Sequence, residues 1–483
     1  MNNICNNCKK TFEILEDDLN FYKKIAVPPP TWCPECRMIR RMLMRNERAL
    51  YKRNCDLCKK PTISMYAPDA PYVVYCNICH QSDGWDPLSY GQDFDFSKTF
   101  TEQRATLMKV VPRRALYQDF ATNSEYTNWG VYLKNSYLVF GGHHYEDVLY
   151  ASQSFNLTNC MDIDFSKQSE ACYGSVNLTR CNRVYYSSYS EDCIDSWFLY
   201  GCRNCQHCIG CTNLRNAQYY IFNERYSKED YDKKIIELQL GSNTNIQELQ
   251  KRATTHSLQY PRKFASVKQI TNSTGDDLEQ TKNCIRCFSA TEDENVRYSF
   301  FVPTGAKDSY DLDHVGLGTE LAYELMSGFG ANRVAFGNRV YYTHDAYYCD
   351  DCYNSSNLFG CIGMKKKEYC IFNKQYTKEA YKDLLPTIID HMKRSGEWGE
   401  FFAPSIAPFA YNETTAQEYF PLTKDAALAQ GFRWKNADSK NYTPTIFAAD
   451  LPNDIKQVGD DMLQAIIGCS HTGTCNDQCT TAF

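Results

Sequence analysis

The sequence of 483 residues lacks the features that mark membrane and secreted proteins. No stretch approaches the 18 or more consecutive apolar residues of a transmembrane helix. The opening residues, MNNICNNCKKTFEILEDD, have no basic segment followed by an apolar one, so they do not read as a secretory signal peptide. An odd number of cysteines, 25, fits poorly with a disulfide framework. We therefore predict a cytoplasmic protein with no membrane partner and with reduced cysteines.

The sequence also lacks the common catalytic motifs. GxSxG, Walker A, GxGxxG and HExxH do not occur in a suitable context. Two clusters could be drawn as metal or acid–base sites, although solvated turn residues are the favoured interpretation of both. They are His143-His144 with Glu146 and Asp147, and Asp311 with Asp313 and His314. The residues therefore identify no reaction.

Positive charge is slightly outnumbered overall, by 58 Asp and Glu to 52 Lys and Arg, but it is concentrated near the N-terminus. The net charge is −6; residues 1–60 carry 13 Lys and Arg against 7 Asp and Glu, a balance of +6, which leaves −12 for the rest. Apolar residues at helical spacing predict a basic helix within residues 37–54. Its side chains suit either the phosphate backbone of RNA or DNA, or carboxylates of the acidic remainder. They are Arg37, Arg40, Arg41, Arg45, Arg48, Lys52 and Arg53.

Cysteine is the residue that stands out, because the first eight occur as four CxxC pairs. Two such pairs bring four thiolates to one tetrahedral ion, which suits Zn²⁺ and leaves no open coordination position for catalysis. We predict two structural zinc ions per chain. The second unit also predicts two strands, PTISMYAP and PYVVYC, around a turn at Asp69-Ala70. The predicted ligands are Cys5, Cys8, Cys33 and Cys36 for one ion, and Cys55, Cys58, Cys76 and Cys79 for the other.

The first of these units resembles the bacterial zinc-ribbon family defined by CxxC and CPxCR. The resemblance rests on Cys5-x-x-Cys8, Phe12, the Phe21-Tyr22 pair and Cys33-Pro34-Glu35-Cys36-Arg37. It covers about 35 residues. It implies a fold and a metal and no reaction.

From residue 123 the chain becomes rich in Asn, Ser, Tyr and Cys, and a short repeat emerges. Equivalent residues fall at 136, 148, 160, 172, 181, 193 and 205, in steps of 12 with one of 9. Such a period is typical of a stacked repeat. We expect two steps, about 21–24 residues, to make one coil of a parallel β-helix. Similar steps of 12 and 13 return between residues 283 and 346.

The two repeat blocks end in the same motif, which divides the chain. YYIFNERYSKEDY (219–231) and YCIFNKQYTKEAY (369–381) each predict a closing strand and a capping helix, with Ser227 or Thr377 as N-cap. The predicted regions are 1–48 (ribbon 1 and the start of the basic helix), 49–88 (ribbon 2), 89–226 (linker and solenoid block 1), 227–280 (helical capping insert), 281–376 (solenoid block 2), 377–468 (capping helix and irregular linker) and 469–483 (incomplete ribbon start).

Across most of its length the chain is similar to a group of uncharacterised multi-zinc-ribbon proteins of uncultivated bacteria. The similarity rests on RNERALYKRNCDLC, WDPLSYGQDFDFSKTF, NSEYTN and the IFNxxYxKExY repeat, and implies architecture but no activity. It also implies a further C-terminal ribbon, from which this sequence departs. Three interpretations of Cys475 and Cys479 stay open: an uncompleted ribbon, a half-site completed by a second subunit in a homo-oligomer, and a tail without metal.

One more cysteine run needs an explanation. Cys202, Cys205, Cys208 and Cys211 follow one another at CxxC spacing, as in iron–sulfur proteins, but the run ends without the usual C-x₃-C-P. A third zinc or thiols packed at successive corners of a coil are the alternatives. An iron–sulfur cluster is the less favoured interpretation, and packing is the most favoured.

These observations predict a mainly β fold, with N-terminal zinc ribbons followed by a parallel β-helix-like solenoid in two blocks with capping helices. The favoured function is a zinc-binding, non-catalytic scaffold. Its expected partner is RNA or DNA at the basic helix, or another protein. The competing hypotheses are a redox enzyme that uses residues 202–211 and a carbohydrate-active β-helix.

Overall fold

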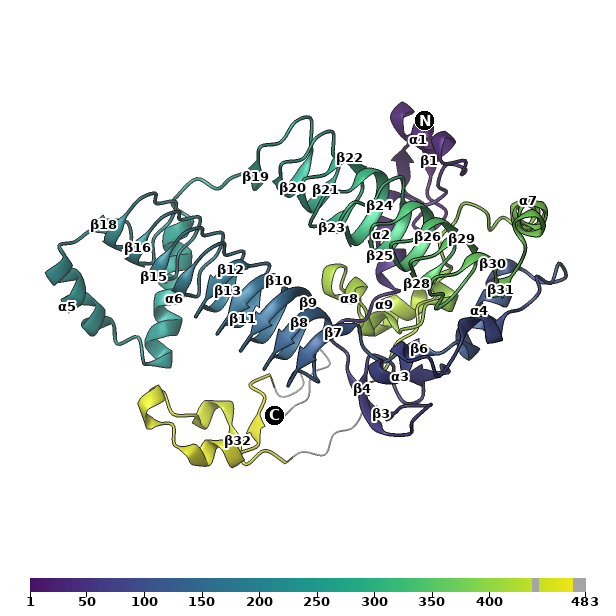
Figure 1. The fold of residues 1–483 in the computed structure, drawn as a ribbon. Helices are drawn as coiled ribbons and strands as arrows, with labels where there is room; N and C mark the ends of the chain where they lie inside the picture. Colours follow the sequence, from purple (N-terminus) through teal and green to yellow (C-terminus); the bar gives the residue numbers. More distant parts are fainter. Residues whose placement is uncertain (437–442, 472–483) are drawn as a thin grey trace. The chain divides into compact units, whose positions relative to one another are not determined.

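The computed structural model describes residues 1–436 and 443–471 (Figure 1). They form two compact units. The ribbon unit is Met1–Leu116 with Lys263–Lys435, and the solenoid unit is Tyr117–Arg262 with the described part of Asn436–Phe483. Large parallel sheets dominate both units, so the fold is mainly β. Among the described helices, none combines the length and the apolar character needed to cross a membrane.

The solenoid unit contains the first solenoid, which advances one coil every 12 residues. Leu149 pairs in parallel with Tyr137 on one side and Met161 on the other, and the same step joins Ile209 to Ile221 in the last coil. A step of 12 is thus a whole coil, and the predicted coil of about 21–24 residues is wrong. The strands are β7 (Gln118–Thr122), β8 (Asn128–Lys134), β9 (Tyr137–Glu146), β10 (Leu149–Thr158), β11 (Met161–Asp164), β12 (Lys167–Glu170), β13 (Tyr173–Val176), β14 (Asn182–Tyr185), β15 (Ile194–Trp197), β16 (Gln206–Ile209), β17 (Gln218–Ile221) and β18 (Glu224–Arg225).

Backbone conformation explains why the coil is so short. Every third residue adopts the left-handed conformation, and the residue after it points into the coil. Twelve residues therefore make four corners, and the narrow interior between them favours Ser, Cys, Ala and Val. Four successive left-handed residues are Asp147, Tyr150, Gln153 and Asn156, with φ of 55°, 53°, 48° and 56°, and the buried residues that follow them are Val148, Ala151, Ser154 and Leu157.

The end of the first solenoid is covered by two helices, α5 (Lys228–Leu238) and α6 (Asn243–Ser257). The predicted N-cap is confirmed, because the Ser227 side chain accepts from the backbone N–H of Asp230. The ring of Tyr231 in α5 packs at a tilt against that of Tyr219 in the closing strand, with ring centroids 5.5 Å apart. These helices shield an edge that would otherwise be open to further strands.

The ribbon unit contains the second solenoid, which repeats every 12 or 13 residues. Tyr310 pairs with Tyr323, a step of 13, and Tyr323 pairs with Ala335, a step of 12. Its cap is α7 (Lys378–Arg394), where Thr377 is the N-cap. The strands are β19 (Val267–Lys268), β20 (Gly275–Glu279), β21 (Cys287–Thr291), β22 (Glu294–Arg297), β23 (Phe300–Val302), β24 (Lys307–Gly316), β25 (Tyr323–Phe329), β26 (Asn332–Tyr341), β27 (His344–Tyr347), β28 (Asp350–Tyr353), β29 (Ser356–Phe359), β30 (Glu368–Ile371) and β31 (Lys374–Gln375).

The N-terminal 116 residues fold onto one aromatic side of the second solenoid. Phe21 stacks on Tyr310 at 3.9 Å between ring centroids, and Phe100 lies 4.8 Å from Tyr348. The elements are β1 (Asn2–Ile4), β2 (Thr11–Glu13), α1 (Glu16–Lys24), α2 (Pro34–Met42), β3 (Tyr51–Asn54), β4 (Pro61–Ser64), β5 (Val74–Tyr75), α3 (Asn77–Gln81), η1 (Pro87–Tyr90), α4 (Phe100–Val110) and β6 (Arg113–Arg114).

Two local predictions are wrong in this segment. The basic helix ends at Met42 and the chain re-forms as β3, because Asn46 turns it: the Asn46 side chain bonds backbone groups of Ala49 and Met65. The expected pairing of PTISMYAP with PYVVYC does not occur either. Instead β4 pairs with β3, and β5 pairs with β6.

The remaining described elements are short. The predicted linker and block 1, residues 89–226, are divided between the two units, since the first unit extends to Leu116. After α7 come η2 (Pro404–Ile406), η3 (Tyr411–Glu413), α8 (Thr415–Tyr419) and α9 (Lys424–Ala429) in the ribbon unit, and β32 (Ile446–Phe447), η4 (Ala448–Asp450), η5 (Ile455–Gln457), η6 (Asp460–Gln464) and β33 (Ile467–Gly468) in the solenoid unit.

Candidate metal centres

The first cysteine cluster forms between a hairpin and a helix. Cys5 and Cys8 lie in the turn between β1 and β2, where Lys9 takes the left-handed conformation and donates its N–H to the carbonyl of Cys5 at 3.0 Å. Cys33 is the N-cap of α2, and Cys36 lies in its first turn. Pro34 suits the start of this helix, because proline has no N–H and the first helical N–H has no partner within the helix. The four sulfur atoms lie within 4.8 Å of one another.

The second cluster repeats this design. Cys55 and Cys58 lie in the turn between β3 and β4, and Lys59 is left-handed, like Lys9, and donates to the carbonyl of Cys55 at 2.9 Å. Cys76 is the N-cap of α3, as Cys33 is of α2. The sulfur atoms of Cys55, Cys58, Cys76 and Cys79 again lie within 4.8 Å of one another. The sulfur atoms therefore come together in the two sets of four that the sequence predicted.

Hydrogen bonds favour the thiolate form of one cysteine in each cluster, whereas burial raises the pKa of Cys8 and Cys76. The N–H of Cys33 donates to the sulfur of Cys5, and that of Cys76 to the sulfur of Cys55, each at 3.2 Å. The hydrogen bond with Cys36 lowers the pKa of Cys33 to about 5. Burial would raise the pKa of Cys55, but backbone hydrogen bonds from Cys76 and other residues outweigh it and lower the pKa to about 7. Four clustered thiolates fit a Zn²⁺ ion, which would tie each hairpin to its helix.

The basic helix does not present its charge to solvent. Arg37 donates from Nε and Nη2 to the two carboxylate oxygens of Asp311, at 3.1 and 2.8 Å. Arg41 donates from Nε to Asp313 at 2.5 Å and from Nη1 to Asp311 at 3.1 Å. All four side chains are buried. The sequence left open whether these arginines contact phosphate or carboxylate. In the structure they contact carboxylates.

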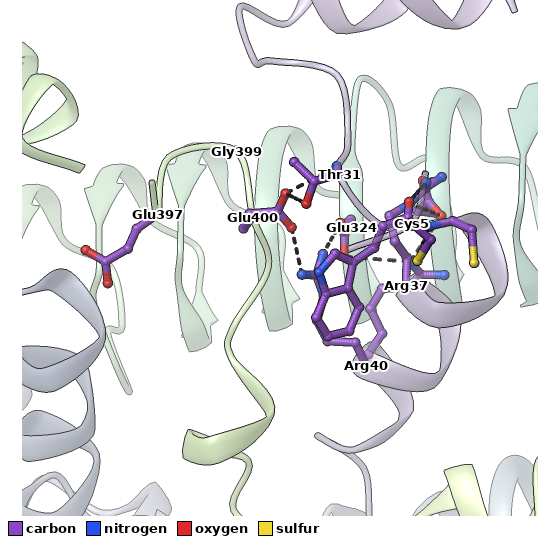
Figure 2. Close-up of polar contacts among 12 residues, drawn as sticks. Cys5, Thr31, Arg37, Arg40, Glu324, Glu397, Gly399 and Glu400 are labelled. Atoms are coloured by element: carbon purple, nitrogen blue, oxygen red, sulfur yellow. Dashed lines mark hydrogen bonds and ion pairs between the residues drawn. The ribbon is translucent and has the colours of Figure 1, made fainter. Parts of the chain in front are cut away.

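Arg40 joins the same interface to the C-terminal segment of the ribbon unit. Its Nη2 donates to Glu324 at 2.7 Å and its Nη1 to Glu400 at 2.8 Å (Figure 2). Thr31 donates its hydroxyl to Glu400 at 2.6 Å, and the Arg40 guanidinium lies over the Trp32 ring at 4.5 Å. Helix α2 is thus bound both to the second solenoid, through Glu324, and to the segment after α7, through Glu400.

The remaining predicted nucleic-acid residues are divided between interior and surface. Arg45 is buried and donates to Glu47 and to Ser327, both at 2.6 Å. Arg53 is largely buried and pairs with Asp56 at 3.1 Å. Arg48 is 47% exposed and pairs with Glu418 at 3.2 Å, and Lys52 is exposed on β3. Only these last two of the seven offer their charge at the surface of this unit.

Burial changes the acid strength of the carboxylates that receive these arginines. It raises the pKa of Asp313 to about 6 and that of Glu324 to about 7, although the neighbouring guanidinium groups oppose the shift. The favoured interpretation of Asp311, Asp313 and His314 as solvated turn residues is wrong, because these residues are 0%, 0% and 6% exposed within β24. Asp311 and Asp313 form an ion-pair interface where a metal or acid–base site was the alternative. The signal that could have shown this is YDLD, in which two carboxylates alternate with Tyr310 and Leu312.

A further buried carboxylate, Asp350, was not singled out from the sequence. Arg113 and Arg339 each donate to it at 2.5 Å, and Arg104 lies 3.8 Å away. Burial would raise the pKa of Asp350, but these three cations lower it to about 2. Arg113 stands in β6, which pairs with β5 of the second ribbon, so this contact joins the second ribbon to the solenoid as Asp311 joins the first.

The cysteine run at 202–211 occupies four successive corners of the first solenoid. All four side chains are buried, and their thiols donate to backbone carbonyls, for example Cys208 to Gln206 at 3.3 Å. Among the described residues, the groups whose ligand atoms converge as metal sites are the two N-terminal ones. Cys475 and Cys479 lie outside the described residues. His143 and His144 lie exposed on the outside of a coil, with Nδ1 atoms 2.7 Å apart.

Comparisons with known proteins assign no family. No family model matches the chain, and no curated protein matches it. One solved structure matches, that of a protein described as a "putative acetyltransferase" from Desulfovibrio desulfuricans G20. The match covers 52% of this chain and 70% of the other chain, with 10% identity and a TM-score of 0.12. At that TM-score the likeness carries no argument about fold or function.

Proposed function

We propose that this protein is a zinc-dependent, non-catalytic binding scaffold whose partner is another protein. Two structural zinc ions hold the ribbons in shape, and the ribbons in turn close the aromatic side of the second solenoid. The observation that carries the proposal is the position of α2. The helix begins at the cysteine cluster, and within two turns its arginines reach Asp311 and Asp313.

The chemistry of the clusters supports a structural role for the metal. Each offers four thiolates and leaves no position for a substrate or a reactive water. Loss of the ion would leave the start of α2 unrestrained. Arg37 and Arg41 would then lose the ion-pair geometry that offsets the cost of burying their charge. Zinc therefore acts on the solenoid interface through the orientation of this helix.

A protein partner is favoured over nucleic acid by the burial of the basic helix. Phosphate contacts need several exposed cations, because affinity rises with the number of counterions released. In the predicted set, Arg37, Arg40, Arg41 and Arg45 are at most 4% exposed. Rigid solenoid sides that carry aromatic residues are instead suited to protein contacts.

Hydrogen exchange on the full chain tests the structural role of the metal. Chelation of zinc should increase exchange in α2 and in β24 and β25, because the buried ion pairs depend on the ribbon. Exchange in β15 and β16 of the solenoid unit should not change and is the internal control. Cys8→Ser should reproduce the effect of the chelator at α2, whereas Cys58→Ser should act mainly at β3 and β4. Unchanged exchange in β24 and β25 after metal loss would contradict the proposal.

A further inference from the structure

The two solenoids end in the same closing strand and capping helix, so their coils can be matched by counting back. Five coils before Ile221 in the first solenoid, the parallel pairs lead to Met161. Five coils before Ile371 in the second, they lead to Tyr310. The strand Met161–Asp164, MDID, is therefore the counterpart of residues 310–313, YDLD.

The match includes the two carboxylates that bind arginine in the ribbon unit. Asp162 corresponds to Asp311, and both are left-handed, with φ of 53° and 58°. Asp164 corresponds to Asp313, and each follows a buried aliphatic residue. The backbone conformation and the residue types thus match at the two places.

The flanking tyrosines match as well. Tyr150, in the coil before MDID, corresponds to Tyr298, and both are left-handed, with φ of 53° and 55°. Tyr173, in the coil after it, corresponds to Tyr323, since Met161 pairs with Tyr173 as Tyr310 pairs with Tyr323. In the ribbon unit the Arg37 guanidinium lies 5.6 Å from the Tyr298 ring centroid.

The difference between the two places is coverage. Tyr298 and Tyr323 are 6% and 0% exposed beneath the first ribbon and α2. Tyr150 is 46% and Met161 36% exposed. Asp162 is exposed and Asp164 half-buried. Partial burial and the charge of Asp164 raise the pKa of Asp162, and a cation at this position would relieve both effects.

We propose that the first solenoid carries a second ribbon-docking site at Asp162 and Asp164, and that its occupant is a zinc ribbon of a partner protein whose helix presents two arginines four residues apart. The inference rests on the proposed function, of which it specifies the partner. The two arginines would take the places that Arg37 and Arg41 take on the second solenoid. One helical turn separates such residues, which matches the two carboxylates two residues apart on a strand.

One difference between the two solenoids bears on which arginines the partner helix would need. Gly174 stands where Glu324 accepts from Arg40. A side chain at Gly174 is disfavoured, because an added Cβ would lie 2.9 Å from the Tyr186 ring. The partner helix therefore needs counterparts of Arg37 and Arg41, but none of Arg40.

The test uses the full chain and, as probe, a zinc-loaded peptide of residues 1–45 that is checked for one bound zinc. We expect one peptide per chain, measured by titration calorimetry. Asp162→Asn with Asp164→Asn should weaken binding by at least about tenfold, whereas Glu170→Gln, an exposed carboxylate change on the same solenoid, should have no effect. In the peptide, Arg37→Ala with Arg41→Ala should abolish binding, and Arg40→Ala should leave it within about threefold.

Three results would overturn the proposed docking site or change its occupant. Absence of binding, or binding that ignores the Asp162 and Asp164 changes, overturns the proposal. Equal sensitivity to Arg40→Ala also overturns it, because that is the pattern expected for exchange at the second solenoid. Concentration-dependent self-association of the full chain that is lost with Asp162→Asn and Asp164→Asn would make the occupant a second copy and not a partner. Zinc content of the same samples reports separately on the proposed function.

Discussion

Arg37 and Asp311, 274 residues apart in the sequence, form a two-point ion pair that is sealed from solvent. A planar guanidinium and a carboxylate suit such pairing, which fixes direction as well as distance. Arg41 and Asp313 lie beside them, so the docking of the first ribbon is decided by a small group of charges inside an aromatic interface. The helix that begins at the first cysteine cluster is thus joined to the second solenoid at this place.

Breaking one partner of this network should be costly. Arg41→Ala and Asp313→Ala are each expected to lower the free energy of unfolding of the ribbon unit by about 3–5 kcal/mol, because the remaining charge stays buried without compensation. The double substitution should cost less than the sum, and a double-mutant cycle in denaturant measures the coupling. Arg48→Ala, which removes an exposed pair, should cost about 0–1 kcal/mol. Equal effects of Arg41→Ala and Arg48→Ala would contradict the buried network.

Metal analysis of protein purified without added metal should give two zinc ions per chain. Cys8→Ser and Cys58→Ser should each remove one ion, because each cluster consists of four thiols within 4.8 Å. Cys208→Ser is the matched control and should leave both ions in place. Iron present in reproducible amounts would contradict this assignment and revive the redox hypothesis for residues 202–211.

The sequence predicted the two four-cysteine clusters, because CxxC spacing places both cysteines of a pair in one turn. It also showed the repeat of 12, but not that 12 residues make a whole coil. That depends on left-handed backbone at every third residue, including Tyr150 and Gln153, which are residue types that rarely adopt it. The destination of the arginines was open for another reason: guanidinium suits phosphate and carboxylate alike, and the deciding carboxylates lie in a distant coil.

The interior thiols of the first solenoid should behave as packing residues. Cys208 and Ser196 occupy the same corner in adjacent coils, and each donates to the carbonyl two residues before it. We therefore expect Cys208→Ser to change the free energy of unfolding by less than about 1.5 kcal/mol, and Cys208→Leu to cost about 1–3 kcal/mol by overpacking. A thiol reagent should modify Cys208 only after denaturant is added. Rapid labelling in the native protein would indicate an accessible, reactive site instead.

The buried carboxyl of Asp293 should make the stability of the ribbon unit depend on pH. The side chain is 1% exposed, its Oδ1 accepts from the N–H of Ala306 at 2.7 Å, and its Oδ2 has no hydrogen-bond partner among the described residues. Burial raises its pKa to about 8. The folded state therefore holds a proton that the unfolded state has released. The resulting stabilisation is complete below about pH 4 and is lost as the pH rises towards 8.

Asp293→Asn isolates this effect, because the amide keeps the acceptor for Ala306 and does not titrate. Relative to the unchanged protein, the variant should gain about 2 kcal/mol or more in unfolding free energy between pH 5 and pH 9, measured in denaturant at each pH. Asp313 and Glu324, whose pKa values are also raised, are present in both proteins, so their contributions cancel in the difference. Glu292→Gln, an exposed change at the adjacent position, should show no such pH-dependent gain. A difference between Asp293→Asn and the unchanged protein that stays constant across this range would mean that the Asp293 carboxyl is ionised in the folded protein throughout.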